Sequence, residues 1–110
     1  MALSWEEFEK IDIRVGTIVD VKDFLKDRNP SYQLWIDFGD LGIKKSSAQI
    51  TQLYAKEDLL GMQVSAVVNF PPKQIANFMS ECLVIGAIGK DKEVSLLTPS
   101  VKTFNGSKVG

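Results

Sequence analysis

The chain has 110 residues, of which 45% are hydrophobic and 25% are charged, and its formal net charge is −1 at pH 7. This length predicts a single domain over residues 1–110, and this composition is typical of soluble globular proteins. With this net charge the chain lacks the strong basic excess of many nucleic-acid-binding proteins, so phosphate binding would depend on a local patch of lysines.

Two residue types that carry much enzyme chemistry are scarce. The chain has no histidine and a single cysteine, Cys82. Without histidine, Ser-His-Asp and Cys-His catalysis have no general base, and one cysteine forms neither an internal disulfide nor a structural zinc centre. Cys82 stands at the start of an apolar run and is expected to be a small core residue. We therefore expect a protein that is not an enzyme and binds no metal or cofactor.

Neither a membrane helix nor a signal peptide is expected from the sequence. No apolar run approaches the ~20 residues of a membrane helix. Residues 1–10 lack the basic and apolar regions of a signal peptide. These features predict a cytoplasmic protein without membrane insertion.

The first predicted element is a short helix near the N-terminus. Ser4 and Glu7 have the spacing of a capping box, in which each side chain satisfies a backbone amide at the helix start. Trp5 and Phe8 are three residues apart and would share one helix face.

Three strands are predicted in the first half of the chain. In residues 11–21 apolar residues, Val19 among them, alternate with charged ones, which predicts a half-buried strand. Gly16 within this run predicts a bulge or a barrel bend. Residues 32–38 alternate in the same way, and residues 43–50 give the third strand.

The second half of the chain completes the predicted fold. A short helix is predicted over residues 51–61, closed by Gly61. Residues 63–70 and 82–88 give the fourth and fifth strands, and residues 93–97 a short additional strand. Five strands with a helix between the third and the fourth is the order of an OB-fold barrel. We therefore predict an all-β, five-stranded OB barrel with a short N-terminal helix, another small β-barrel being the alternative.

The connection between the fourth and fifth strands is the best candidate for a working surface. The segment NFPPKQIANFMSE, residues 69–81, is longer than a plain hairpin turn. Pro71 and Pro72 stiffen it, which lowers the entropy cost of binding, and Lys73 supplies a cation. Its large apolar side chains either line a binding surface or cap the end of the barrel. These side chains are Phe70, Ile75 and Phe78.

The third strand offers a row of small and polar side chains. Lys45, Ser47 and Gln49 are predicted to face one side of this strand, and Lys44 the other. Such a row hydrogen-bonds a chain-like ligand or forms an ordinary polar sheet face. Both readings stay open.

Trp35 is the unusual residue of the second strand, because it lies on the side where solvent is expected. Large exposed aromatic side chains often mark contact surfaces. Trp35 would stack on a nucleic-acid base, pack against a second subunit, or be buried under the terminal segments.

Four stretches of the sequence resemble the CsaA-like secretion chaperones, a branch of the tRNA-binding OB-domain family. They are DIRVGTIVDV, IDFGDLGIKKSSAQIT, VVNFPPKQIANFMSECLVIG and NGSKVG, and the resemblance covers the chain from about Phe8 to Gly110. It implies a five-stranded OB barrel and a homodimer with the terminal segments at the interface. Proteins of this branch are associated with binding unfolded preproteins for export, whereas the wider family binds the outside of folded tRNA.

A homodimer is also expected because one small barrel cannot easily bury all of the large apolar side chains near its ends. The expected dimer contacts are Trp5, Phe8, Trp35, Val101 and Phe104.

Two functions are expected, both through the same face of the barrel. The first is a CsaA-like chaperone that holds unfolded preprotein in an apolar groove, with lysines that favour acidic groups on the ligand. The alternative is a tRNA-binding module without catalysis. In the family the segment linked to tRNA contact corresponds to Ser80 and Leu83. The candidate ligand-binding residues are Lys44, Lys45, Ser47, Gln49, Asn69, Phe70, Pro71, Pro72, Lys73, Ile75, Phe78, Ser80 and Leu83.

Overall fold

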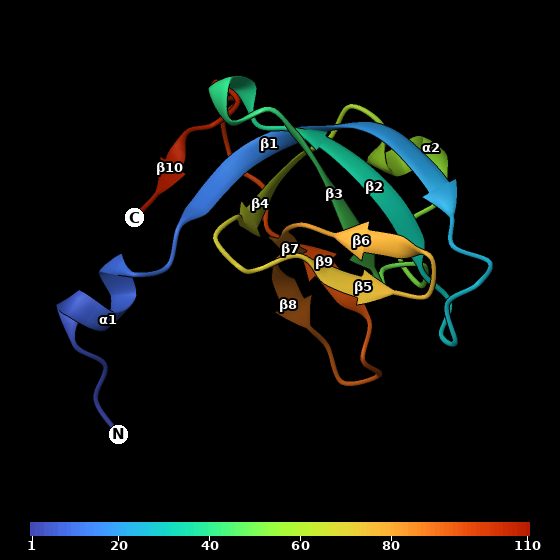
Figure 1. The fold of residues 1–110 in the computed structure, drawn as a ribbon, viewed down its shortest axis with the longest axis horizontal. Coiled ribbons are helices and arrows are strands. Elements are labelled where there is room, and N and C mark those ends of the chain that lie inside the picture. The colour runs from blue at the N-terminus through green and yellow to red at the C-terminus, as the bar shows by residue number, and fades with distance from the viewer.

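A long first strand organises the fold of the computed structural model, which describes residues 1–110 (Figure 1). Strand β1 (Ile13–Asp23) pairs with β4 (Gln63–Val67) along its first half and with β2 (Tyr32–Asp37) along its second half. Its start also pairs with the short C-terminal strand β10 (Lys108–Val109). One strand thus joins both halves of the sheet and both ends of the chain.

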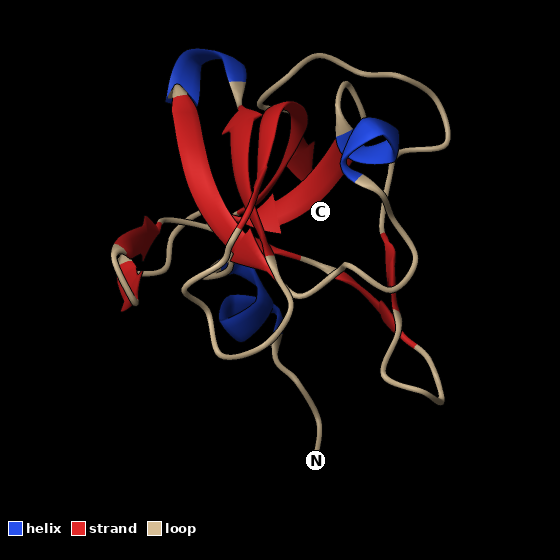
Figure 2. Ribbon diagram, turned by 90° about the vertical axis from the view of Figure 1, so that its right-hand side faces the viewer, coloured by secondary structure: helices blue, strands red, loops and turns tan.

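The main sheet has the strand order β3-β2-β1-β4-β7, with β3 spanning Ile43–Ala48 and β7 spanning Leu83–Val84. It curves until β3 approaches β7, where the Ser46 hydroxyl donates a hydrogen bond of 2.9 Å to the Cys82 carbonyl. Figure 2 shows the strands curving around the interior with the helical segments at their periphery. This nearly closed, mainly β barrel confirms the predicted OB-like fold.

Shorter elements complete the chain around the barrel. The short segments β5 and β6 form one hairpin, and β8 and β9 form a second. Neither α-helix has the length and apolar character that a membrane crossing requires. The bounds are α1 Trp5–Glu9, η1 Gly39–Leu41, α2 Lys56–Leu59, β5 Lys73–Ile75, β6 Phe78–Ser80, β8 Gly86–Ile88 and β9 Val94–Leu96.

The core lies inside the barrel and follows the alternation of β2. Leu34, Ile36 and Phe38 are fully buried, as the alternation in residues 32–38 predicted. Leu59 of α2 is also fully buried in this cluster and fills the barrel from one end. Cys82 belongs to the same cluster, which confirms its predicted role as a core residue.

The predicted alternation of β1 is wrong at Val19, although Val21 packs against the core as predicted. Ile18 is fully buried, whereas Val19 is 44% exposed, because the pairing of β1 with β2 shifts register between Ile18 and Asp20. Of the bulge or barrel bend predicted at Gly16, the bulge is wrong, because Gly16 pairs regularly with Val64 and the register shift follows Ile18. A Cβ atom at Gly16 would lie 2.6 Å from a methyl group of Ile36, so glycine lets the two strands approach closely.

Three other elements differ from prediction in extent. Helix α2 is one turn long, although Gly61 follows it at φ +87° as the expected stop signal. The predicted fifth strand is divided into β7 and β8, which pair with different partners. The connection 69–81 is not a plain loop, because it contains the β5–β6 hairpin. Helix α1 is confirmed, with both hydrogen bonds of the Ser4–Glu7 capping box present.

Candidate ligand-binding site

The β5–β6 hairpin presents one face to the barrel and one to solvent. Lys73 pairs with Ser80 and Ile75 pairs with Phe78 across the hairpin, and because side chains alternate along a strand, these four share a face. Phe78 is buried, and the other three line a pocket against the barrel. The hairpin therefore forms one wall of a site whose other walls belong to the barrel.

The aromatic ring of Phe78 fixes the hairpin to the barrel. It packs edge-on against Phe24 and Trp35, with ring centroids 5.4 Å and 5.8 Å away. The ammonium of Lys45 lies 5.1 Å from the Phe78 ring and that of Lys22 lies 5.0 Å from the Trp35 ring. Trp35 therefore packs within its own chain. It lies under β6, whereas the predicted option of burial within the chain placed it under the terminal segments.

Side chains complete the junction between β3 and β6. The Lys45 N–H donates to the Glu81 carboxylate at 2.9 Å, and the Glu81 N–H donates to the Lys45 carbonyl at 2.7 Å. The Ser47 N–H donates to the Ser80 hydroxyl oxygen at 3.1 Å. Ser80 and Glu81 therefore supply acceptors that a neighbouring strand would otherwise provide to β3.

An open pocket of about 360 Å³ lies between the hairpin and the barrel. Its lining consists of Ser47, Phe70, Pro71, Lys73, Ile75, Ser80, Cys82 and Leu83. All of these except Cys82 are among the candidate binding residues predicted from the sequence. Phe70 and Leu83 are each about half exposed, so apolar surface on two sides of this pocket is accessible. We call it the hairpin pocket below.

A single positive charge belongs to the hairpin pocket. Burial raises the pKa of the Cys82 thiol to about 12, so the thiol is neutral at physiological pH. Lys73 is the remaining ionisable group of the lining. It takes part in none of the three ion pairs of the structure, so no carboxylate of the chain neutralises it.

Six predicted site residues do not line the hairpin pocket, and five of them are described first. Gln49 lines a separate polar pocket, together with residues of the turn between β1 and β2. Lys44 lies on the face of β3 that carries buried Ser46, and the ammonium of Lys45 lies over Phe78. Pro72 is exposed and does not line the pocket. Phe78 contributes to the site as a buried support.

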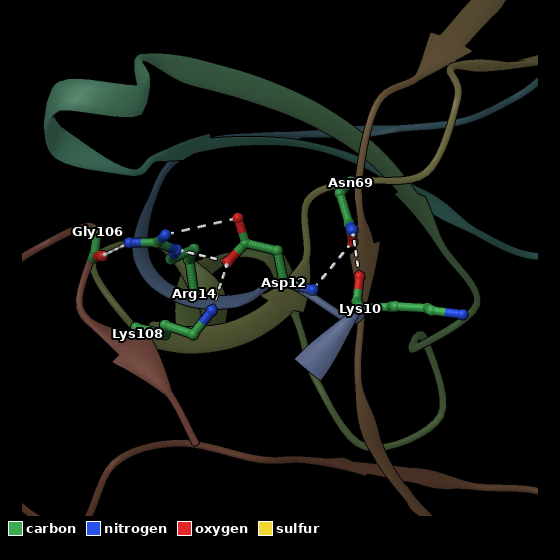
Figure 3. A network of polar contacts seen from close by, with 6 residues as sticks. All are labelled: Lys10, Asp12, Arg14, Asn69, Gly106 and Lys108. Atoms are coloured by element: carbon green, nitrogen blue, oxygen red, sulfur yellow. Dashed lines mark hydrogen bonds and ion pairs between the residues drawn. The ribbon is translucent and has the colours of Figure 1, made fainter. Parts of the chain in front are cut away.

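Asn69 joins the segment that leads into the hairpin pocket to the N-terminal part of the chain (Figure 3). Its amide donates to the Lys10 carbonyl at 2.7 Å and accepts from the Asp12 N–H at 3.0 Å. Its side chain is thus bonded within the chain, whereas the sequence predicted it as a ligand contact. Phe70 and Pro71 follow directly, so this pair of bonds sets where that pocket wall begins.

The same network continues to the C-terminus, which sequence reasoning missed. Asp12 forms an ion pair of 2.6 Å with Arg14, and the ammonium of Lys108 lies 4.0 Å from the same carboxylate. Arg14 also donates to the Gly106 carbonyl at 3.1 Å (Figure 3). The alternation of β1 placed Asp12 and Arg14 on one polar face, but it gave no sign that β10 would join them.

The terminal segments carry large apolar side chains without cover from the barrel. Trp5 is 82% exposed, and Val101 and Phe104 are each 76% exposed, whereas Phe8 is half-buried. The backbone before Phe104 is tied to the barrel, because the Gln63 side chain forms hydrogen bonds of 2.6 Å and 3.1 Å with the backbone of Thr103. We refer to these four apolar side chains, two in α1 and two in the segment before β10, as the terminal surface.

Comparisons with known proteins agree with this architecture. Residues 13–108 match the family described as "Putative tRNA binding domain". The crystal structure of the chaperone CsaA from Bacillus anthracis is similar over 100% of both chains, with 46% sequence identity and a TM-score of 0.95. The CsaA chaperone protein from Picrophilus torridus is 53% identical, with a TM-score of 0.93, over 99% of this chain and 100% of that one.

Much longer proteins contain a similar segment. A methionine–tRNA ligase from Nanoarchaeum equitans is 37% identical over 110 residues, which cover 97% of this chain and 13% of the ligase. A methionine–tRNA ligase from Porphyromonas gingivalis is 32% identical over 97% of this chain and 15% of the ligase. The chain thus spans only about a seventh of the curated relatives it matches.

Proposed function

The chain belongs to the tRNA-binding domain family as a CsaA-like member, and from this membership we propose that it is a chaperone. In this proposal the protein acts in the cytoplasm as a homodimer. It holds unfolded preprotein in extended form for export and catalyses no reaction.

The observation that carries this proposal is the composition of the hairpin pocket. Its apolar walls consist of Phe70, Pro71, Ile75 and Leu83, and the pocket is open to solvent, so a side chain of a polypeptide can enter it. Such walls suit side chains that are buried in folded proteins and exposed in unfolded ones. A pocket of this size accepts one or two side chains, so an extended segment fits it better than a folded surface.

Substitution of the exposed pocket walls tests the proposal. We expect the double variant F70S/L83S to bind a labelled unfolded polypeptide about tenfold more weakly or worse, because it loses apolar contact area. The measurements are fluorescence anisotropy and light scattering of an aggregating client. I88S is the matched control, because Ile88 is as apolar and 75% exposed but lies outside the pocket. Unchanged client protection by F70S/L83S would refute the proposal.

A second copy of the chain is the partner we propose for the terminal surface. Its side chains are aromatic and aliphatic, which is the composition of the central part of a homodimer interface. Their exposure in the single chain supports an intermolecular contact.

A second candidate function is binding of folded tRNA, which the family match favours. The contacts with the tRNA backbone would then come from Lys44, Lys45, Lys73 and Ser80. A titration with bulk tRNA at several salt concentrations tests it, with an expected log–log slope of about −2 to −4 for a few phosphate contacts. A flat salt response would rule out this function and leave the polypeptide proposal standing.

A further inference from the structure

We propose that the hairpin pocket selects polypeptide segments in which a bulky apolar side chain lies next to a carboxylate, and that Lys73 makes this selection. This inference rests on the proposed polypeptide-binding function and specifies its ligand. In this inference the apolar walls of the pocket hold one side chain of the ligand, and the Lys73 ammonium attracts a carboxylate on the adjacent ligand residue.

The apolar part of the selection comes from three different segments of the chain. Phe70 and Pro71 lie before the hairpin, Ile75 belongs to β5, and Leu83 to β7. A ligand side chain that enters between them loses water on several sides at once. Large aliphatic and aromatic side chains gain most from this, because the free energy of burial follows apolar area.

The charged part of the selection comes from Lys73, because it is the one ionic group of the lining. It lies on the same face of β5 as Ile75, so its ammonium adjoins the apolar wall. Its partner across the hairpin is Ser80, a neutral residue. A ligand carboxylate beside the bound apolar side chain would therefore find an ammonium that no acid of the chain pairs with.

The other ionic groups near the hairpin are engaged elsewhere. The Lys45 ammonium lies over the Phe78 ring, and the Glu81 carboxylate accepts the Lys45 N–H. Lys44 lies on the face of β3 opposite to that of Lys45. The charges of Lys44 and Glu81 act on Cys82 in opposite directions, whereas Lys73 is the ionic group of the lining itself, so a basic ligand residue beside it would meet a like charge.

Three peptides of equal length, blocked at both ends, test the inference. Each carries one phenylalanine flanked by glutamate, glutamine or lysine. We expect the parent protein to bind the glutamate peptide about threefold to tenfold more tightly than the lysine peptide, because attraction in one is replaced by repulsion in the other. Affinities are measured by fluorescence anisotropy at low and physiological salt.

Variants at Lys73 assign the effect to this residue. K73Q should abolish the preference, and K73E should reverse it in favour of the lysine peptide. K90Q is the matched control, because Lys90 is an exposed lysine in the turn between β8 and β9 and should keep the parent preference. A preference that persists unchanged in K73Q would overturn the inference.

A further pair of peptides distinguishes the source of the carboxylate. Both end in phenylalanine, one with a free C-terminus and one amidated. A preference for the free terminus that disappears in K73Q supports the inference with a chain terminus as the source. Equal affinity for all five peptides would overturn the inference and leave polypeptide binding intact. Binding of none of them would refute the proposed function as well.

Discussion

The β5–β6 hairpin and the terminal surface contain similar aromatic side chains in opposite situations. Phe78 of the hairpin is buried against Phe24 and Trp35 of its own chain. Trp5 and Phe104 of the terminal surface are largely exposed in the single chain. The comparison teaches that an aromatic residue in a connecting segment indicates a packing contact. It does not indicate whether the contact is made within the chain or with another molecule. The partner depends on whether the barrel brings another ring into reach.

The largest expected effect comes from removing the intramolecular partner. F78A should lower the free energy of unfolding by about 3–5 kcal/mol, because it leaves a cavity between the hairpin and the barrel. Urea denaturation measures this effect. F70A is the control, because Phe70 is half exposed, and it should cost less than about 1 kcal/mol. Equal losses in both variants would show that the hairpin is not held by Phe78.

The next effect concerns the homodimer that we propose to form through the terminal surface. W5S/F104S should raise the dimer dissociation constant at least about 30-fold, because central aromatic residues contribute most of the binding energy of an interface. Sedimentation equilibrium measures the constant, and circular dichroism should show an unchanged fold. L25S is the control, since Leu25 is a similarly exposed residue in a turn. A dimer that survives W5S/F104S must use another surface.

A smaller effect is expected where the two regions are linked. N69A removes the hydrogen bonds of Asn69 to Lys10 and Asp12 and should cost about 1–2 kcal/mol of stability. Amide hydrogen exchange at Asp12 should accelerate, since its N–H donates to the Asn69 side chain. N77A, at an asparagine in the tip of the hairpin, is the control. If exchange at Asp12 stays at the parent rate in N69A, the link does not protect this segment.

The smallest effect concerns the hairpin alone. Ala76 has φ +52° at the tip of the hairpin, a conformation that disfavours residues with a Cβ atom. A76G should therefore raise the free energy of unfolding by about 0.5 kcal/mol, despite the entropy cost of glycine. A87G in β8 should lower it by about 0.5–1 kcal/mol. Thermal denaturation of both variants checks the opposite signs, and a loss in A76G would contradict this account of the turn.

The barrel strands could be predicted because apolar side chains that face the barrel interior alternate with polar side chains that face solvent. The rule failed at Val19, where one extra residue in β1 changes which side chains face inward. The β5–β6 hairpin could not be predicted, because strands of three residues are too short to show alternation. Its turn also lacks glycine, which usually marks a hairpin.

The hairpin pocket could be predicted in part from the sequence. Phe70, Pro71 and Lys73 were found because stiff apolar connections beside a barrel often serve as contact surfaces. Gln49 was misplaced into the same group, because the predicted row along the third strand continues past the end of β3. The burial of Phe78 depends on Phe24 and Trp35, which are distant in sequence, so no local pattern could reveal it.

The junction of β3 with Ser80 and Glu81 has a consequence for how such proteins diversify. Side-chain oxygens take the place of backbone carbonyls there, so the hairpin is attached to the barrel at a few points rather than by a continuous ladder. Insertions, deletions or grafted sequences between Asn69 and Ser80 that keep the anchoring Phe78 would leave the pairing of β1, β2, β3 and β4 intact. Evolution, or a protein engineer, can therefore exchange the hairpin as a cassette and change the ligand while the barrel is kept.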